Sequence, residues 1–354
     1  MDRIVMTGGG TSGHVTPNLA LIPHLKKLGY EIHYIGTEDG IERNLVEREG
    51  IPYHPIRAGK LRRYLTIKNV VDTFRVLKGF QEAFSTLRKL KPSLLFSKGG
   101  FVTSPVVWAA YLNRIPIIIH ESDMTPGLAN KLAMPFADKI CYTFPETGEY
   151  ITDEKGVVTG LPVRQMLFRG KKSEGKKICD FSSNKPTLVV IGGSQGSKVL
   201  NDSVRASLEE LLEKYQVCHL CGQGGIDQSL KGKQGYAQFD YVNEELPHLF
   251  AMADLVISRA GATTIFELLA LKKPSLLIPL SKKASRGDQI LNANSFKEQG
   301  FSQVLFEEDL SKDSFLQALE ETYNNRKKMI EYMEDSDSSN GVERVVQLIK
   351  EVKK

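Results

Sequence analysis

The sequence is poor in cysteine, the residue that cross-links many extracellular proteins. Its 354 residues include only four, Cys141, Cys179, Cys218 and Cys221. So few thiols exclude a disulfide scaffold and are typical of a protein that works in a reducing compartment. Cys218 and Cys221 have C-x-x-C spacing, but no second pair accompanies them, and on a strand residues three apart point to opposite faces. We therefore expect neither a zinc site nor a redox site there.

Long apolar runs and a large charge excess are also missing. No apolar run reaches the roughly 18 residues of a membrane-spanning helix, and the longest candidate, residues 105–119, is interrupted by Asn113, Arg114 and Pro116. The net charge of +5 is too small to indicate a nucleic-acid partner. The N-terminal residues lead directly into a predicted strand, so we expect no signal peptide. A length of 354 residues favours two domains over one.

Short β-branched runs alternate with helical patterns, and this alternation occurs twice. The first series of predicted strands begins at residues 3–8 and the second at residues 186–191, with a junction near residues 160–165. Alternating strands and helices are typical of parallel sheets covered by helices on both faces. The sequence therefore predicts two similar, doubly wound α/β domains.

Each half opens with a glycine-rich turn between a strand and a helix, at residues 6–20 and 191–200. Glycine allows positive φ and a close approach of the backbone to a phosphate, and the helix N-terminus behind such a turn attracts an anion. One such turn often serves only tight packing. Two at equivalent places indicate a cleft that holds phosphates from both sides.

The first turn also fits a different class of protein. Gly8, Gly10 and Gly13 have the G-x-G-x-x-G spacing of a dinucleotide site, and Glu38 could be the acidic residue that such a site places after its second strand. That hypothesis gives no reason for His14 or for the second glycine-rich turn. We therefore favour another phosphate-bearing ligand.

Three motifs together resemble the MurG family of N-acetylglucosaminyltransferases of peptidoglycan synthesis. They are GGGTSGHVTPNLA at residues 8–20, GGSQGS at 192–197 and RAGATTIFELLALKKP at 259–274. The resemblance covers nearly the whole chain and implies the GT-B fold, in which two Rossmann-like domains with parallel sheets face each other across a deep cleft. It implies an acceptor- and membrane-facing domain at 1–163, completed by a C-terminal helix at 341–354, and a UDP-sugar-binding domain at 164–340.

The resemblance also implies an activity. N-acetylglucosamine would move, with inversion, from UDP-N-acetylglucosamine to the C4 hydroxyl of the muramoyl sugar of lipid I, the undecaprenyl-pyrophosphoryl-muramoyl-pentapeptide, giving lipid II and UDP. It implies no cofactor and no tightly bound metal. It places the protein peripherally on the anionic, cytoplasmic face of the membrane, beside other cell-wall synthesis proteins. Two alternatives stay open, namely a UDP-sugar enzyme that does not act on lipid, such as a 2-epimerase or another glycosyltransferase, and a non-catalytic sugar-nucleotide-binding regulator.

Matching the motifs residue by residue assigns a donor site. Ser194 matches the phosphate-contacting serine, Glu267 the glutamate that pairs with both ribose hydroxyls, and Gln289 the glutamine that binds the transferred sugar. Val242 falls where the family recognises the uracil edge through backbone atoms. The other predicted donor-binding residues are Thr11, Ser12, Gly13, Asp123, Arg164, Ala262, Thr263 and Thr264.

A base must remove the proton of the acceptor hydroxyl, and His14 and Glu121 are the two candidates. Histidine titrates near pH ~6.5, which suits this step, but the sequence does not rank the two. The family commonly has H-E-Q-N where this chain has residues 120–123, H-E-S-D. Its asparagine contacts the sugar. Asp123 keeps the size and the acceptor oxygens of that asparagine but loses the amide donor.

Residues 57–91 form a basic amphipathic stretch with ten Lys and Arg against two acidic residues. A helix here would put Val70, Phe74, Leu77 and Phe84 on one face. Val76, Phe80 and Leu87 would extend this apolar stripe beyond what packing on a sheet needs. The stretch predicts a surface that rests on anionic lipid, and the alternative is an ordinary helix of the first domain. The predicted membrane contacts are Lys68, Phe74, Arg75, Leu77, Lys78 and Phe80.

Overall fold

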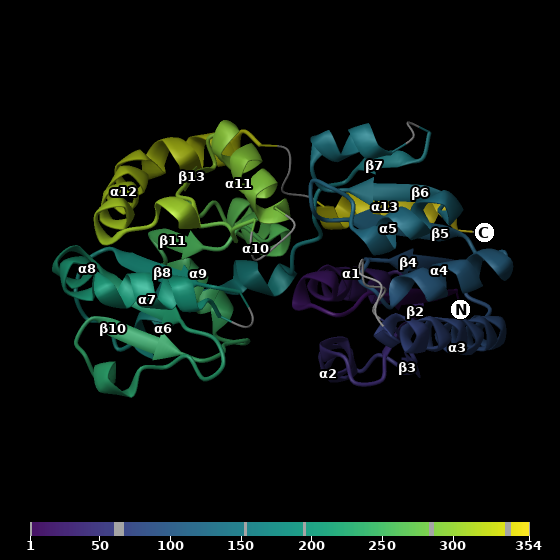
Figure 1. Cartoon of the computed structure of the whole chain (residues 1–354). Helices are drawn as coiled ribbons and strands as arrows, with labels where there is room; N and C mark the ends of the chain where they lie inside the picture. The colour runs from purple at the N-terminus through teal and green to yellow at the C-terminus, as the bar shows by residue number, and fades with distance from the viewer. Residues whose placement is uncertain are drawn as a thin grey trace. The chain divides into compact units, whose positions relative to one another are not determined.

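The computed structural model describes residues 2–59, 67–151, 154–193, 196–282, 287–336 and 341–353, and for residues 67–73 it describes the backbone alone. The chain folds into two compact units (Figure 1). Unit 1 comprises Met1–Arg164 with Asn340–Lys354, and unit 2 comprises Gln165–Ser339. Both are parallel sheets flanked by helices, so the predicted doubly wound α/β class is confirmed.

The described residues of unit 1 build a seven-stranded sheet in the order β3-β2-β1-β4-β5-β6-β7, with every pair parallel. Its strands are β1 (Arg3–Thr7), β2 (Glu31–Thr37), β3 (Tyr53–Ile56), β4 (Leu94–Ser97), β5 (Ile117–Glu121), β6 (Lys139–Tyr142) and β7 (Gly156–Val158). Its α-helices are α1 (Thr16–Lys27), α2 (Ile41–Arg48), α3 (Ile67–Leu90), α4 (Thr103–Leu112), α5 (Leu128–Ala133) and α13 (Gly341–Val352). The 3-10 helices are η1 (Ser12–His14), η2 (Met134–Phe136) and η3 (Pro145–Tyr150).

Helices cover both faces of this sheet, which is why its central strands β1, β4 and β5 are largely apolar and carry polar residues only at their ends. Side chains of α1 and α13 pack with β1 on one face, and those of α3 and α4 pack with β1, β4 and β5 on the other. The chain crosses from β3 over to β4, which lies beside β1. The strand order therefore reverses between β1 and β4, and in open α/β sheets ligands bind at the carboxyl ends of the strands at such a point.

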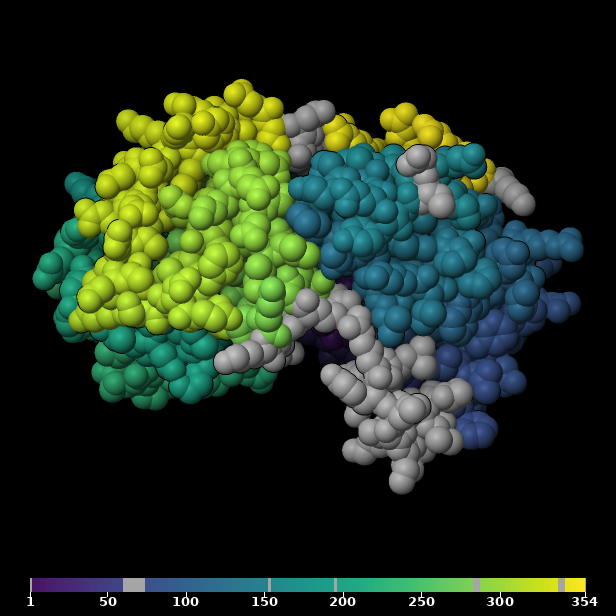
Figure 2. Space-filling view, turned by 45° about the horizontal axis from the view of Figure 1, so that its top comes forward, coloured from purple at the N-terminus to yellow at the C-terminus, as the bar shows by residue number. Residues whose placement is uncertain are grey.

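The C-terminal helix α13 is part of unit 1 although it follows unit 2 in sequence. Val345 and Ile349 lie in the same buried cluster as Leu21 and Leu25 of α1. Gly341 begins the helix where a Cβ atom would come within 2.3 Å of the Leu161 carbonyl, so a glycine is needed at this close approach. In Figure 2 the yellow C-terminal segment lies beside the blue surface of unit 1.

The described residues of unit 2 build a six-stranded parallel sheet in the order β10-β9-β8-β11-β12-β13, which reverses between β8 and β11. Its strands are β8 (Thr187–Ile191), β9 (Gln216–Leu220), β10 (Tyr236–Phe239), β11 (Leu255–Ser258), β12 (Ser275–Leu277) and β13 (Ser302–Val304). Its α-helices are α6 (Lys172–Ile178), α7 (Lys198–Ala206), α8 (Leu208–Lys214), α9 (Leu246–Met252), α10 (Ala262–Ala270), α11 (Asp288–Glu298) and α12 (Lys312–Glu334). The 3-10 helices are η4 (Gln165–Arg169), η5 (Gln228–Leu230) and η6 (Glu307–Asp309), and α7, α8 and α12 pack on one face of the sheet.

The outward face of α3 differs from the predicted one. Val76 and Leu87 are buried and Phe80 packs against the core, so the prediction that these three extend the apolar stripe beyond what packing on a sheet needs is wrong. Phe74 and Leu77 are instead the apolar residues left outside, 68% and 55% exposed. The described apolar residues of the outward face are therefore Phe74 and Leu77, whereas Phe80 packs toward the core of unit 1. The side chains of Lys68 and Val70 fall outside the described residues.

Candidate active site

The second glycine-rich turn follows β8 at the reversal point of unit 2. Gly193 and Gly196 both have positive φ, +92° and +74°. At Gly196 a Cβ atom would lie 2.1 Å from the Cys221 carbonyl oxygen, so only glycine fits. Ser197 then begins α7 by accepting a hydrogen bond from the Leu200 amide at 3.4 Å. This is the predicted strand–turn–helix arrangement, but the predicted phosphate contact, Ser194, lies outside the described residues.

Arg259, the first residue after β11, joins several loops of unit 2. The residue is only 7% exposed, and its guanidinium donates a hydrogen bond to Ser197 Oγ at 2.8 Å. It donates to the carbonyl oxygens of Ile278 and Pro279 at 3.1 and 3.3 Å, and it forms an ion pair with Glu307. One buried cation therefore holds together the segments that follow β8, β12 and β13. This arginine is the first residue of the third motif, and no role was predicted for it.

The N-terminus of α10 lies next to the predicted sugar-binding glutamine. Gln289 Oε1 accepts a hydrogen bond from the Leu280 amide at 3.1 Å, and its Nε2 lies 4.0 Å from the place where a Cβ of Gly261 would be. Gly261 is the N-cap of α10. The fixed carbonyl leaves the amide nitrogen of Gln289 directed to the helix N-terminus, where a donor group suits an anionic or hydroxyl-rich ligand.

The remaining donor candidates of unit 2 occupy the same carboxyl edge of the sheet. Ala262, Thr263 and Thr264 form the first turn of α10, with Ala262 buried and both threonines half-buried. Glu267, one turn further, is 4% exposed, so it is not the solvated glutamate of an ordinary surface helix. Val242 is half-buried in the segment after β10. The donor candidate Arg164 belongs instead to unit 1, where it is half-buried and is the last residue of the first segment.

In unit 1, the turn after β1 lies against the turn after β4. The Gly9 amide donates to the Gly99 carbonyl at 3.3 Å, and a Cβ at Gly100 would lie 2.1 Å from the Gly9 carbonyl oxygen. The Gly10 amide donates to the carboxylate of Glu42, a fully buried residue, at 3.2 Å. Two amides of the first glycine-rich turn, those of Gly9 and Gly10, therefore already donate hydrogen bonds within the protein. This acidic support behind the turn was not predicted.

The predicted residues Thr11, Ser12, Gly13 and His14 complete this turn. Thr11 is exposed and the other three are half-buried in or beside η1. The His14 amide donates to the Thr11 carbonyl at 3.2 Å, which fixes the backbone of the histidine at the entry to α1. His14 is thus a half-buried residue at the carboxyl edge of the sheet, with its Nδ1 turned away from solvent.

Glu121, the other candidate base, is 3% exposed at the end of β5. Its Oε1 accepts hydrogen bonds from the amides of Ser122 and Asp123 at 2.8 and 3.1 Å. Its Oε2 accepts from the Gly127 amide at 3.0 Å and from Asn130 Nδ2 at 2.8 Å. Four donors therefore saturate the carboxylate, and this residue organises the 121–130 segment.

Lys98 is a buried cation of this site that was not predicted from the sequence. It follows β4 directly, is 1% exposed and donates from Nζ to Ser122 Oγ. Burial lowers its pKa from 10.5 to about 8, while the nearby charges of Glu121 and Asp123 oppose this shift. The S-K-G-G sequence after an apolar strand is the only signal that could have drawn attention to it.

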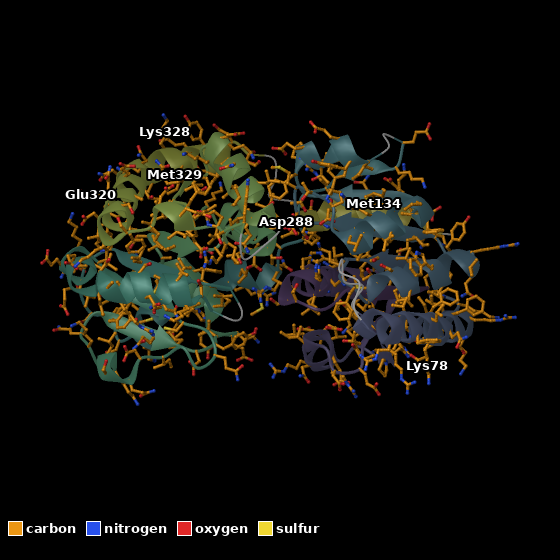
Figure 3. The ribbon with its side chains drawn as sticks, in the orientation of Figure 1. Lys78, Met134, Asp288, Glu320, Lys328 and Met329 are labelled. Atoms are coloured by element: carbon orange, nitrogen blue, oxygen red, sulfur yellow. The ribbon has the colours of Figure 1, made fainter. Side chains whose placement is uncertain are left out.

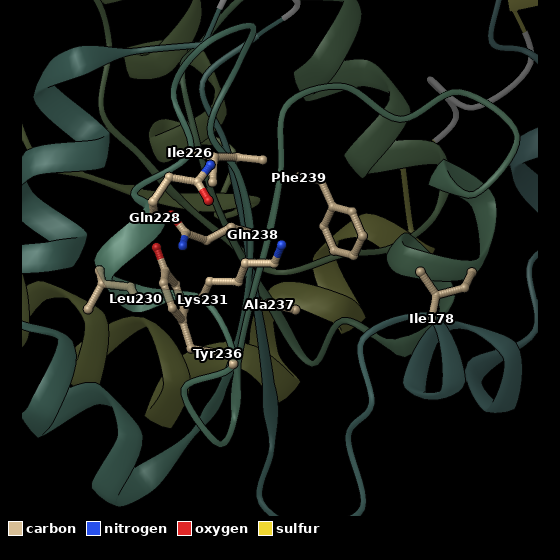
Figure 4. Close-up of a pocket in the computed structure, with 10 residues that line it drawn as sticks. Ile178, Ile226, Gln228, Leu230, Lys231, Tyr236, Ala237, Gln238 and Phe239 are labelled. Atoms are coloured by element: carbon tan, nitrogen blue, oxygen red, sulfur yellow. The ribbon is translucent and has the colours of Figure 1, made fainter.

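A separate hollow of about 310 Å³ lies at the outer edge of the unit 2 sheet (Figure 4). It is lined by β10, η5 and Ile178 of α6, and none of the predicted donor residues contributes to it.

In the described part of the chain, no group of three or more His, Cys, Asp or Glu side chains is placed to hold a metal ion. No described helix is both long and apolar enough to cross a membrane.

Comparisons with known proteins agree with this architecture. Residues 4–142 match the N-terminal domain of glycosyltransferase family 28, and residues 187–350 match its C-terminal domain. The chain is 59% identical over 98% of its length to the UDP-N-acetylglucosamine--N-acetylmuramyl-(pentapeptide) pyrophosphoryl-undecaprenol N-acetylglucosamine transferase of Clostridium tetani, of which it covers 97%. It is also 59% identical to the transferase of the same name from Clostridium novyi, with 99% of each chain covered.

A solved structure of Acinetobacter baumannii MurG has a similar fold, with a TM-score of 0.78 at 24% identity, covering 99% of this chain and 100% of the other. Two parallel-sheet α/β units with glycine-rich turns at their reversal points, together with these matches, define a GT-B glycosyltransferase. The chain belongs to glycosyltransferase family 28. The resemblance to the MurG family predicted from the sequence is confirmed, and the hypothesis of a dinucleotide enzyme is wrong.

Proposed function

We propose that the protein transfers N-acetylglucosamine from UDP-N-acetylglucosamine to the C4 hydroxyl of the muramoyl sugar of lipid I, with inversion, giving lipid II and UDP. The observation that carries this proposal is the identity of 59% over nearly the full length to two transferases named for this reaction. The geometry of unit 2 supports it, because the predicted donor residues that the structure describes in this unit lie at the carboxyl edge of one sheet.

On this proposal unit 2 holds the donor. Glu267 accepts hydrogen bonds from the ribose hydroxyls, the backbone at Val242 binds the uracil edge, and Gln289 binds the sugar. As the bond between C1 and the diphosphate breaks, the sugar gains positive charge and the diphosphate gains negative charge. The N-termini of α7 and α10 stabilise that negative charge, so a tightly bound metal and a cofactor are not part of the proposal.

His14 is the proposed base and Glu121 is not. A general base must present an accessible nitrogen or oxygen to the acceptor hydroxyl. Glu121 has both oxygens occupied by four donors from its own segment. His14 is half-buried at the entry to α1 and beside Thr11, Ser12 and Gly13, which stay predicted contacts of the donor sugar. Arg164 likewise stays a predicted donor contact.

We also propose that unit 1 docks on the cytoplasmic face of the membrane through α3. The exposed residues Phe74 and Leu77 alternate with Arg75 and Lys78, which are also exposed. Figure 3 shows Lys78 projecting away from α3. Each basic residue near an anionic surface contributes about 1 kcal/mol, which suits reversible docking by an enzyme that meets a lipid-linked acceptor and a soluble donor.

The deciding experiment incubates the purified protein with labelled UDP-N-acetylglucosamine and a short-chain lipid I analogue. We expect the label in a disaccharide product and one UDP released per transfer. An epimerase would change the donor without any acceptor, and a regulator would bind the donor with no turnover. Either result would overturn the proposed function.

A further inference from the structure

Two acidic side chains occur two residues apart in a partly buried segment of unit 1. Glu121 is 3% exposed and Asp123 is half-buried in the segment that follows β5. A buried carboxylate without a compensating charge is costly, and two neighbouring carboxylates raise that cost. The segment therefore needs a cation close by.

Lys98 is that cation. Its Nζ donates to the hydroxyl of Ser122, the residue between the two acids, and the charges of Glu121 and Asp123 both act to raise its pKa. Its amide donates to the Thr7 carbonyl at 2.9 Å, which fixes the lysine at the reversal point between β1 and β4. The lysine is thus anchored at its backbone and again at its ammonium group.

The other titratable groups around Lys98 do not supply a charge of their own. Burial lowers the pKa of His120 well below its ordinary value, and the charge of Lys98 lowers it further, so this imidazole is neutral. Burial raises the pKa of the Cys141 thiol to about 12. The charged members of this group are therefore Lys98, Glu121 and Asp123.

We propose that Lys98 is the positioning residue that allows this chain to use Asp123 where the family commonly has asparagine. This inference rests on the proposed function: Asp123, with its charge balanced by the nearby Lys98, takes the place of the amide that would contact the transferred sugar. The lysine holds the segment through Ser122 and balances the extra carboxylate, so that an aspartate is tolerated at position 123. An asparagine at this position would leave Lys98 to balance the charge of Glu121 alone.

Transfer kinetics test the pair through four proteins, the wild type, Lys98→Met, Asp123→Asn and the double variant. We expect Lys98→Met to raise the KM for UDP-N-acetylglucosamine roughly tenfold or more, as loss of a charged hydrogen bond does, with the KM for the lipid I analogue little changed. Asp123→Asn in the Lys98→Met background should restore most of the loss. Lys27→Met removes an exposed lysine at the end of α1 and should behave as wild type.

The pH dependence of turnover is a second test that a purely structural lysine would not pass. Because the pKa of Lys98 is lowered to about 8, turnover should fall as the pH rises through that value and the ammonium loses its proton. Asp123→Asn removes a charge that raises the pKa of Lys98, so the decrease of turnover at alkaline pH should begin at a lower pH. Lys98→Met should have no such fall. Two results together would overturn the inference. The increases in KM of the two single variants would multiply in the double variant, and turnover of Asp123→Asn would decrease at the same pH as in wild type.

Unfolding measurements separate this inference from the proposed function. Between pH 8 and 10.5 the unfolded chain keeps the Lys98 proton and the folded chain has lost it, so the free energy of unfolding rises with pH in wild type relative to Lys98→Met. In Asp123→Asn this rise should begin at lower pH. Absence of transfer by wild type would overturn the proposed function alone, whereas identical unfolding profiles of wild type and Lys98→Met would overturn the role of Lys98.

Discussion

Nη2 of Arg259 donates a hydrogen bond to Oγ of Ser197 at 2.8 Å, across the reversal point of the unit 2 sheet. Ser197 begins α7, and the same guanidinium pairs with Glu307 and with two carbonyl oxygens. The position of the glycine-rich turn therefore depends on one planar cation with several donors. A lysine in its place would keep the charge but could not form this fork.

We therefore expect Arg259→Lys to weaken the binding of UDP roughly tenfold or more, because the turn that faces the diphosphate loses its support. Calorimetric titration with UDP measures the effect. Arg326→Lys is the matched control, since Arg326 is a half-buried arginine of α12 that stacks on Tyr323. Equal UDP affinities of Arg259→Lys and wild type would show that the turn is held by other contacts.

The sequence predicted the architecture well and the side-chain network around the site poorly. Strand–helix alternation and glycine-rich turns are local signals, and they predicted two parallel sheets. Arg259, Glu42 and Lys98 have little local signal, because each makes the contact that matters here with a residue between 24 and 48 positions away. On α3 the spacing predicted an amphipathic helix, but only the packing against β3 and α4 decides which apolar residues face inward.

His14 should matter to the chemical step. We expect His14→Ala to lower kcat by roughly the 10²–10⁴ that general-base catalysis contributes, while the affinity for UDP-N-acetylglucosamine changes little. The measurement is kcat with the short-chain acceptor and donor affinity by titration. His24→Ala, a change in the last turn of α1, is the control. Near wild-type kcat in His14→Ala would remove this histidine from the chemistry.

Glu267 and Gln289 should affect different parts of the donor. Glu267→Ala should weaken UDP and UDP-N-acetylglucosamine alike, because the ribose is common to both. Gln289→Ala should weaken UDP-N-acetylglucosamine and leave UDP nearly unchanged. A lost hydrogen bond to a buried partner is worth about 1–3 kcal/mol, so each effect should be tenfold or more. If Gln289→Ala weakens both ligands equally, the sugar does not lie beside the N-terminus of α10.

His219 makes unit 2 sensitive to acid. Its Nε2 lies 2.9 Å from Asn201 Oδ1 and its Nδ1 lies 2.9 Å from the Tyr236 hydroxyl, a pair of partners that suits a neutral imidazole. Burial, assisted by the charge of Arg205, lowers its pKa from 6.5 to about 3. Between these values the unfolded chain binds a proton that the folded chain does not, so the free energy of unfolding falls as the pH falls.

Comparison of wild type with His219→Gln isolates this contribution. One such histidine changes the free energy of unfolding by about 1.4 kcal/mol per pH unit. Denaturant unfolding at several pH values from 6.5 downwards should therefore show the gap between wild type and variant narrowing with acid, as the wild type loses stability faster. A gap that stays constant over this range would mean that the folded chain binds the proton on His219 after all.

The exposed face of α3 yields the last prediction. Replacing Lys68, Arg75 and Lys78 with Glu reverses three charges on the proposed membrane surface and should abolish co-sedimentation with anionic vesicles at low salt. Lys177→Glu, Lys327→Glu and Lys328→Glu change the net charge by the same amount on exposed residues of unit 2 and should leave binding in place. This control separates a local surface from a general effect of net charge.

The same α3 variant also tests whether docking serves the reaction. Turnover on full-length lipid I in vesicles should slow, because the enzyme no longer concentrates at the surface that holds its acceptor. Turnover on a soluble short-chain acceptor should persist, because α3 contributes no predicted donor or catalytic residue. Loss of both activities would mean that the charge reversal damages the fold, and equal vesicle binding by variant and wild type would place the docking surface elsewhere on the protein.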